Sequence, residues 1–178
     1  MVIDLVAIHR INVEPMGFKN TPEGIRTYFE EVKRWKHPAY TAVLWPSGER
    51  WQWAPIGAPT NHAGGDWVTG CVSIAHVGDF REEAPCDALW RLSVRTVAEL
   101  CWALDLVPER RTARKGKVAH EVCGHSEIAA AEGRVWRCPG AAWPLHRYRA
   151  EVERGRTRLA RDLPDVPREE RLALFGWR

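Results

Sequence analysis

Three widely separated side chains are the first candidates for chemistry: His9, His125 and Cys138. His9 ends an apolar strand-like run, His125 follows another, and Cys138 lies in the next loop, so the ends of neighbouring strands could bring them together. Zinc prefers histidine nitrogen and cysteine sulfur, and a catalytic zinc site has three protein ligands and one position open to water. Spacing alone does not distinguish zinc ligands from histidines that only form hydrogen bonds within the fold. The three residues could therefore be either zinc ligands or structural residues at this point.

A second histidine competes with His125 for the same role. His120 stands beside Glu121 and offers another His–Glu pair near Cys138. We favour His125 because it lies in a Gly-His-Ser-Glu setting and closer to the loop that carries Cys138. The remaining candidates are expected to be structural, with no metal at His37, His76 or His146 and with buried thiols at Cys71, Cys86, Cys101 and Cys123.

The elements that position these side chains follow from hydrophobic periodicity and turn signals. Short apolar or β-branched runs predict strands at residues 2–8, 40–45, 49–54, 71–77 and 118–123. Helical spacing of apolar residues predicts helices at residues 22–36 and 85–106, and Pro144 indicates the start of a third helix at residues 144–160. We expect loops at residues 55–70, 110–117 and 125–138.

This order of elements predicts the fold class. Strands and helices interleave irregularly and include one hairpin, which is typical of an α/β fold with a single mixed β-sheet flanked by helices. A chain of 178 residues has room for one domain and an appendage. We therefore expect a domain at residues 1–150 and an Arg-rich helical C-terminal extension at residues 151–178.

Composition excludes several classes of protein. The chain is 45% hydrophobic and 28% charged, which is typical of a globular protein and not of a disordered one. No apolar run approaches the roughly 20 residues of a membrane-spanning helix, and residues 1–9 lack the features of a secretory signal. Five widely spaced cysteines, an odd number, predict reduced thiols and no disulfide framework.

Charge is distributed unevenly along the chain. Residues 108–178 contain 16 Lys and Arg against 10 Asp and Glu, whereas residues 1–107 contain 10 against 13. A cationic C-terminal third suits an anionic polymer such as nucleic acid or a bacterial cell wall, and it also suits a surface that is merely well solvated. The basic residues form no recognisable nucleic-acid-reading motif, so we expect no nucleic-acid partner.

Five short motifs occur in the order found in one enzyme family. They are Ile8-His9, Tyr40 eight residues before Gly48, Asn61-His62-Ala63-Gly64, Val72-Ser73-Ile74-Ala75, and Gly124-His125-Ser126-Glu127 followed by Cys138-Pro139-Gly140. Together they resemble the zinc-dependent N-acetylmuramoyl-L-alanine amidases of type 2, the superfamily of amidase-type bacteriophage lysozymes and peptidoglycan recognition proteins. The resemblance covers about residues 2–148 and implies the fold of that superfamily and a zinc amidase domain at residues 1–150.

The resemblance also implies a reaction and a cofactor. It assigns one Zn²⁺ to His9, His125 and Cys138. The family cleaves the amide between N-acetylmuramic acid and L-alanine of the peptidoglycan stem peptide, by zinc-activated water. It further implies a catalytic role for Tyr40, which would stabilise the oxyanion or assist proton transfer.

Four further residues are assigned to substrate binding by position: Asn61, His62, Trp136 and Arg137. The chain departs from its relatives here, because catalytic members often have Lys or Thr two residues before the last ligand, where this chain has Trp136. In this chain, Arg137 or Glu127 could be recruited to the proton transfer that the Lys or Thr of those members would serve.

The resemblance favours a phage endolysin for host-cell lysis that hydrolyses the cell wall. Such a protein would be made in the host cytoplasm without a signal peptide and would reach the wall after membrane permeabilisation. We expect a monomer that binds muramyl peptide and does not insert into membranes. Two alternatives remain, a cytoplasmic muropeptide-recycling amidase and a non-catalytic peptidoglycan-binding protein.

Overall fold

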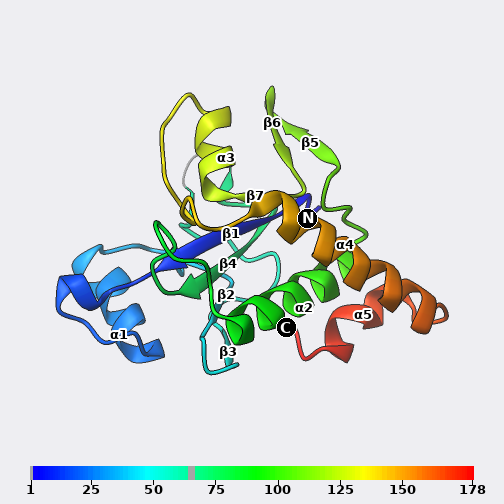
Figure 1. The fold of residues 1–178 in the computed structure, drawn as a ribbon, viewed down its shortest axis with the longest axis horizontal. Coiled ribbons are helices and arrows are strands. Elements are labelled where there is room, and N and C mark those ends of the chain that lie inside the picture. The colour runs from blue at the N-terminus through cyan, green and yellow to red at the C-terminus, as the bar shows by residue number, and fades with distance from the viewer. Residues whose placement is uncertain (1, 64–66) are drawn as a thin grey trace.

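A five-stranded mixed sheet lies at the centre of the computed structural model, which describes residues 2–63 and 67–178 (Figure 1). The strand order is β3-β2-β4-β1-β7, in which β3 is antiparallel to β2 and the other neighbours are parallel. The strands are β1 Leu5–Ile11, β2 Ala42–Leu44, β3 Arg50–Gln52, β4 Cys71–Val77 and β7 Val122–Gly124. The predicted α/β class, a mixed sheet flanked by helices, is confirmed.

The remaining elements surround this sheet. A separate hairpin consists of β5 Arg111–Arg114 and β6 Lys117–His120. The helices are η1 Glu14–Met16, α1 Pro22–Thr27, η2 Tyr28–Val32, α2 Asp87–Leu104, α3 His125–Ala131, α4 Leu145–Asp162 and α5 Arg168–Leu174. Within the described ranges, no helix is both long and apolar enough to cross a membrane.

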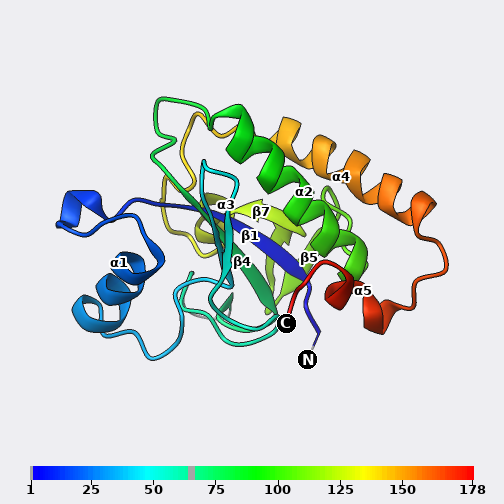
Figure 2. The same cartoon turned by 90° about the horizontal axis from the view of Figure 1, so that it is seen from below.

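One face of the sheet is covered by α2 and α4, which lie side by side across it (Figure 2). Val6 and Ile8 of β1 point to this face and pack with buried residues of both helices, including Leu100 of α2 and Val152 of α4. Each fully buried aliphatic side chain stabilises the fold by about 1.5–3 kcal/mol. This apolar layer packs the strands against α2 and α4 and involves only this face of the sheet.

The opposite face carries two smaller apolar clusters. Leu5 and Ala7 of β1 belong to one cluster, and Ile11 belongs to the other, which contains the aromatic residues of η2. His9 shares their side of the strand, because side chains two residues apart point to the same face. It therefore lies between the two clusters and not in the layer under α2.

The N-terminal helix is shorter than predicted. Thr21 caps α1 by accepting a hydrogen bond from the Gly24 amide at 3.2 Å, and Pro22 occupies the first turn, as its sequence indicates. The chain then widens into the π-helical turn η2, and the helical segment ends at Val32 instead of Lys36. Arg34, with φ of 52°, reverses the chain at that end.

The region 110–124 differs from prediction in two ways. The segment expected as a basic loop contains strand β5, because Lys115 and Gly116 both have positive φ (49° and 79°) and form a two-residue turn that suits a hairpin. The strand predicted at 118–123 is divided into β6 and β7. The break falls at buried Glu121, which pairs with Arg110 and accepts a hydrogen bond from the Val107 amide at 2.7 Å.

The C-terminal helices pack on α2. Trp90 of α2 donates a hydrogen bond to Glu151 of α4 at 2.7 Å. The segment 151–178 comprises the rest of α4, helix α5 and a final turn, in which the Trp177 ring lies 4.1 Å from the Arg50 guanidinium. The predicted helix at 144–160 corresponds closely to α4.

Candidate metal centre

The side chains of His9, His125 and Cys138 converge, and one potential ligand atom from each lies within 4.8 Å of the others. Strand register explains the meeting of the two histidines. Parallel strands β1 and β7 pair Ile8 with Gly124, so the residues that follow, His9 and His125, lie next to each other. Their ring centroids are 4.7 Å apart. The arrangement could hold a divalent metal ion.

His125 is the first residue of helix α3, where a loop was predicted. Glu127 accepts a hydrogen bond from the Gly124 amide at 2.9 Å and so caps the helix. Gly124 fits closely here, because a Cβ would lie 2.9 Å from the end of the Leu145 side chain and 3.0 Å from Pro139. A seven-residue helix after a strand of three residues offers little periodicity in sequence, which is why the prediction was wrong.

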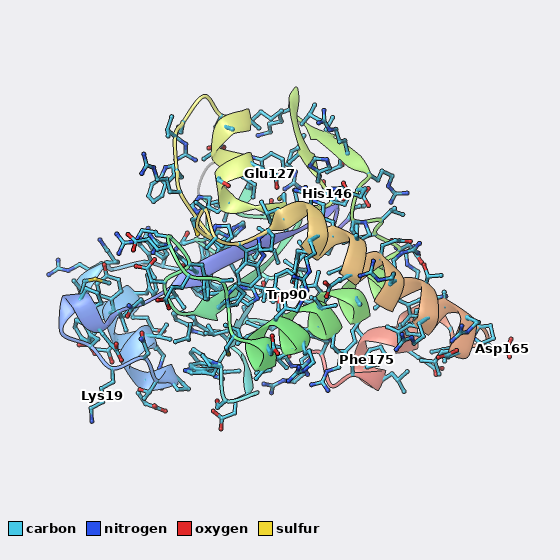
Figure 3. The ribbon with its side chains drawn as sticks, viewed as in Figure 1. Lys19, Trp90, Glu127, His146, Asp165 and Phe175 are labelled. Atoms are coloured by element: carbon cyan, nitrogen blue, oxygen red, sulfur yellow. The ribbon has the colours of Figure 1, made fainter. Side chains whose placement is uncertain are left out.

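The rival histidine does not join this group. His120 Nδ1 lies 3.1 Å from Glu127 Oε1, on the capping side of α3. Glu127 also forms an ion pair with Arg149 of α4, which is buried and donates a hydrogen bond to the Val122 carbonyl at 2.6 Å. Figure 3 shows Glu127 on α3 close to the first turn of α4, which carries His146. Glu127 thus positions the start of α3.

Cys138 reaches the group from the loop after α3. The Arg10 amide donates to its sulfur at 3.3 Å, and the Ser126 amide donates to its carbonyl at 2.8 Å. Burial raises the pKa of the Cys138 thiol to about 11, while the Arg10 amide and guanidinium act in the opposite direction. A bound cation would further favour the thiolate, which is the ligand form of cysteine.

The two candidate ligand histidines are held neutral. Burial, followed by the neighbouring His125, lowers the pKa of His9 well below its usual value. Burial, followed by the charge of Arg134, lowers the pKa of His125 to about 4. Neutral imidazole is the form that offers a nitrogen lone pair to a metal ion.

His62 and Asn61 lie beside the group but use their polar atoms within the protein. His62 is 4% exposed, with Nδ1 3.0 Å from His9 Nε2 and Nε2 2.9 Å from the Trp67 carbonyl. The Asn61 side chain donates to the His37 carbonyl at 3.2 Å. Gly64, the last residue of the motif that contains them, lies outside the described residues.

Tyr40 precedes β2 and packs against the same histidine. Its ring centroid is 5.3 Å from that of His9 and 5.7 Å from that of Phe29. Burial, followed by the nearby Cys138, holds the pKa of Tyr40 well above its usual value. Its hydroxyl is therefore a neutral hydrogen-bond donor at physiological pH.

A cleft of about 890 Å³ opens over the three converging side chains. Trp136 and Arg137 are exposed on its wall, and the Trp136 ring stacks on the His125 ring at 5.2 Å between centroids. The described lining contains seven basic side chains, namely Arg10, Lys33, Arg34, Lys36, Arg81, Arg134 and Arg137. Its described carboxylate, Asp79, already pairs with Arg10 and Arg81. The cleft is suited to an anionic ligand.

Several of these cleft residues were not foreseen from sequence. The run Lys33-Arg34-Trp35-Lys36 was a visible signal, since it combines positive charge with an aromatic residue. Arg134 gave no signal of its own. It donates to the Ala63 carbonyl at 3.1 Å and lines the cleft beside His125, because the chain turns back after α3.

Comparison with protein families identifies one match. A sequence model described as N-acetylmuramoyl-L-alanine amidase matches residues 1–141. The comparison with curated proteins returns no match.

Solved structures with the same fold include enzymes and recognition proteins. An N-acetylmuramoyl-L-alanine amidase, LysC from Clostridium intestinale, has 17% identity and a TM-score of 0.64, with 84% of each chain covered. The Ph2119 endolysin from a Thermus scotoductus bacteriophage has 17% identity and a TM-score of 0.63, over 85% of this chain and 86% of its own. The Drosophila peptidoglycan recognition protein SD has 15% identity and a TM-score of 0.57, over 79% and 76%.

Proposed function

The chain belongs to the N-acetylmuramoyl-L-alanine amidase family, and we propose that it hydrolyses the amide between N-acetylmuramic acid and L-alanine in peptidoglycan, with one zinc ion as cofactor. The observation that carries this proposal is the meeting of His9, His125 and Cys138 under the cleft. These residues come from three distant parts of the chain, and each offers a type of ligand atom that zinc prefers.

The donor set fits zinc in chemistry and in spacing. Bonds of about 2.0 Å to nitrogen and 2.3 Å to sulfur in a tetrahedral site separate those ligand atoms by about 3.5 Å. His9 Nδ1 and Cys138 Sγ are 3.9 Å apart. Three protein ligands leave one position open, as in catalytic sites. When bound there, zinc would supply Lewis acidity that lowers the pKa of water and polarises a carbonyl.

The protein's own side chains would supply the rest of the chemistry. Tyr40, held neutral beside His9, would donate a hydrogen bond to the oxygen on which negative charge develops. Trp136 offers an exposed ring for stacking against substrate, and Arg137 and Asn61 also line the cleft. The basic lining would attract the carboxylates of a stem peptide.

Amide cleavage can be tested on purified bacterial cell walls. We expect the protein to release free α-amino groups of L-alanine without new reducing sugar ends, and we expect a chelator to stop this release. Cys138→Ser should abolish it, whereas Cys86→Ser should not, because Cys86, which was wrongly expected to be buried, is exposed and lies outside the cleft. Walls that bind the wild-type protein but release no amine would instead indicate a non-catalytic binding protein.

We further propose that the protein acts on intact walls, as an endolysin does. The similarity in fold to the bacteriophage endolysin supports this assignment. Rates on intact sacculi and on soluble muropeptides would separate it from a recycling amidase. Faster release from soluble fragments than from walls at equal substrate concentration would contradict the endolysin role.

A further inference from the structure

We propose that His62 is a positioning residue, which accepts a hydrogen bond from His9 Nε2–H and so fixes His9 in the tautomer whose Nδ1 faces the metal ion. The inference rests on the metal centre of the proposed function. It assigns a role to a buried side chain that the proposed reaction does not use.

The argument begins at the carbonyl of Trp67. A carbonyl oxygen only accepts hydrogen bonds, so His62 Nε2, which lies 2.9 Å from it, must be the donor. His62 is 4% exposed, and an uncompensated positive charge at a buried site is costly, so its imidazole is neutral. A neutral imidazole has one protonated nitrogen, so His62 Nδ1 is an acceptor.

The same logic then applies to His9. Its Nε2 lies 3.0 Å from His62 Nδ1, and an acceptor on one side requires a donor on the other. His9 Nε2 therefore carries the proton, and His9 Nδ1 is left with its lone pair. That nitrogen is the one that lies 3.9 Å from Cys138 Sγ, on the side of the proposed ion.

These hydrogen bonds give His9 the support that a metal ligand usually has. Metal-binding histidines usually donate the N–H of their second ring nitrogen to a carboxylate, a backbone carbonyl or water. Here His62 connects the ligand to a backbone carbonyl through a second neutral ring. Both ring nitrogens of His62 are thus engaged, which leaves neither of them to bind substrate.

Two amide substitutions separate this role from a general structural one. In His62→Asn, the side-chain oxygen can take the position of Nδ1 and still accept from His9. In His62→Gln, the amide can reach the position of Nε2 and keep the Trp67 contact, but it leaves His9 without its acceptor. The two variants are similar in polarity. They differ in which hydrogen bond of His62 they preserve, the one with His9 or the one with the Trp67 carbonyl.

The measurement is the affinity for Zn²⁺, by competition with a chromophoric chelator, together with the visible absorption spectrum of the Co²⁺-substituted protein. We expect His62→Asn to bind zinc within a few-fold of wild type and to keep its cobalt spectrum. We expect His62→Gln to bind about 10–100-fold more weakly and to change that spectrum. Val97→Ala, a buried change in α2 on the other face of the sheet, controls for lost stability and should lower the melting temperature without altering zinc affinity.

Equal zinc affinities of the two His62 variants, or a weaker His62→Asn, would overturn the inference while leaving the metal centre in place. A wild-type protein that binds no zinc would instead refute the metal centre itself, and the inference with it. The two failures are therefore distinguishable without any assay of amide hydrolysis.

Discussion

Tyr40 presents a neutral phenol at the edge of the candidate metal centre, and its position suggests a role in stabilising developing charge. Its ring is fixed between His9 and Phe29, which leaves little rotational freedom to lose when substrate binds. A preorganised donor of this kind acts in the transition state more than on bound substrate.

We therefore expect Tyr40→Phe to lower kcat by about 10²–10³-fold, the cost of removing one oxyanion donor. KM and zinc affinity should stay near wild type, since neither depends on the hydroxyl. Steady-state hydrolysis of a muramyl peptide at saturating zinc is the measurement. Tyr148→Phe removes a buried hydroxyl that bonds to Ser93 at 2.6 Å outside the cleft, and it should reduce stability without reducing kcat. Equal losses of kcat in both variants would contradict the role of Tyr40.

For single residues, the sequence predicted which side chains form the candidate metal centre better than it predicted their hydrogen-bond partners. The histidine and cysteine motifs indicated His9, His125 and Cys138 as one group, and their side chains converge in the fold. The partners of His62 could not be predicted, because they depend on how His62 and Trp67 come to lie beside the strand that carries His9. Hydrogen-bond direction is a property of the burial and geometry of the folded chain.

Among the elements, α3 and α4 are coupled through a partly buried ion pair. Arg149 reaches from α4 to Glu127, which caps the helix that begins with His125. Arg149 is 5% exposed and also bonds to the Val122 carbonyl of β7. Its guanidinium therefore holds the end of a central strand and the start of the helix after it.

Arg149→Met should destabilise the protein by about 1.5–3 kcal/mol, because Glu127 and the Val122 carbonyl lose a charged partner. Zinc affinity should also fall, since the first turn of α3 positions His125. Thermal unfolding of the metal-free protein and zinc titration measure the two effects. Arg158→Met, at an exposed position of the same helix, should change neither by much. An Arg149→Met protein as stable as wild type would show that this ion pair contributes little.

Elements with strong periodicity or a clear turn signal were predicted, whereas β5 and α3 were not. The strand β4 and the helix α2 have enough buried apolar residues at regular spacing to be visible in sequence, and α4 was indicated by Pro144, which directly precedes it. The strand β5 is exposed and charged, so no alternation marks it, and α3 spans only seven residues. Their structure is decided by a turn with positive φ and by a cap from Glu127, which are tertiary or conformational effects.

At the scale of the whole molecule, the cleft is the opening where basic side chains from both parts of the chain meet. Seven basic side chains line it, and its described carboxylate is already paired. The uneven charge along the sequence did not predict this, because Arg10, Lys33, Arg34, Lys36 and Arg81 come from the half of the chain with a negative balance. Folding brings them to the same opening as Arg134 and Arg137.

Lys36→Glu should raise KM for a stem-peptide substrate several-fold at low ionic strength, because it reverses a charge on the cleft wall. The difference from wild type should shrink as salt is added, since the Debye length falls from about 10 Å at 0.1 M to about 3 Å at 1 M. KM measured across a salt series tests this. Arg158→Glu makes the same change of charge outside the cleft and should have little effect at any salt concentration. A salt-independent KM in the wild-type protein would rule out electrostatic attraction by the lining.

The pairing of Ile8 with Gly124 has a consequence for how this chain can vary over evolution. Inserting or deleting one residue within β1, upstream of His9, would turn the imidazole to the opposite face, into the apolar layer beneath α2. Gains or losses of sequence should therefore accumulate in the connections between strands, and β1 and β7 should keep their length in any descendant that retains the site.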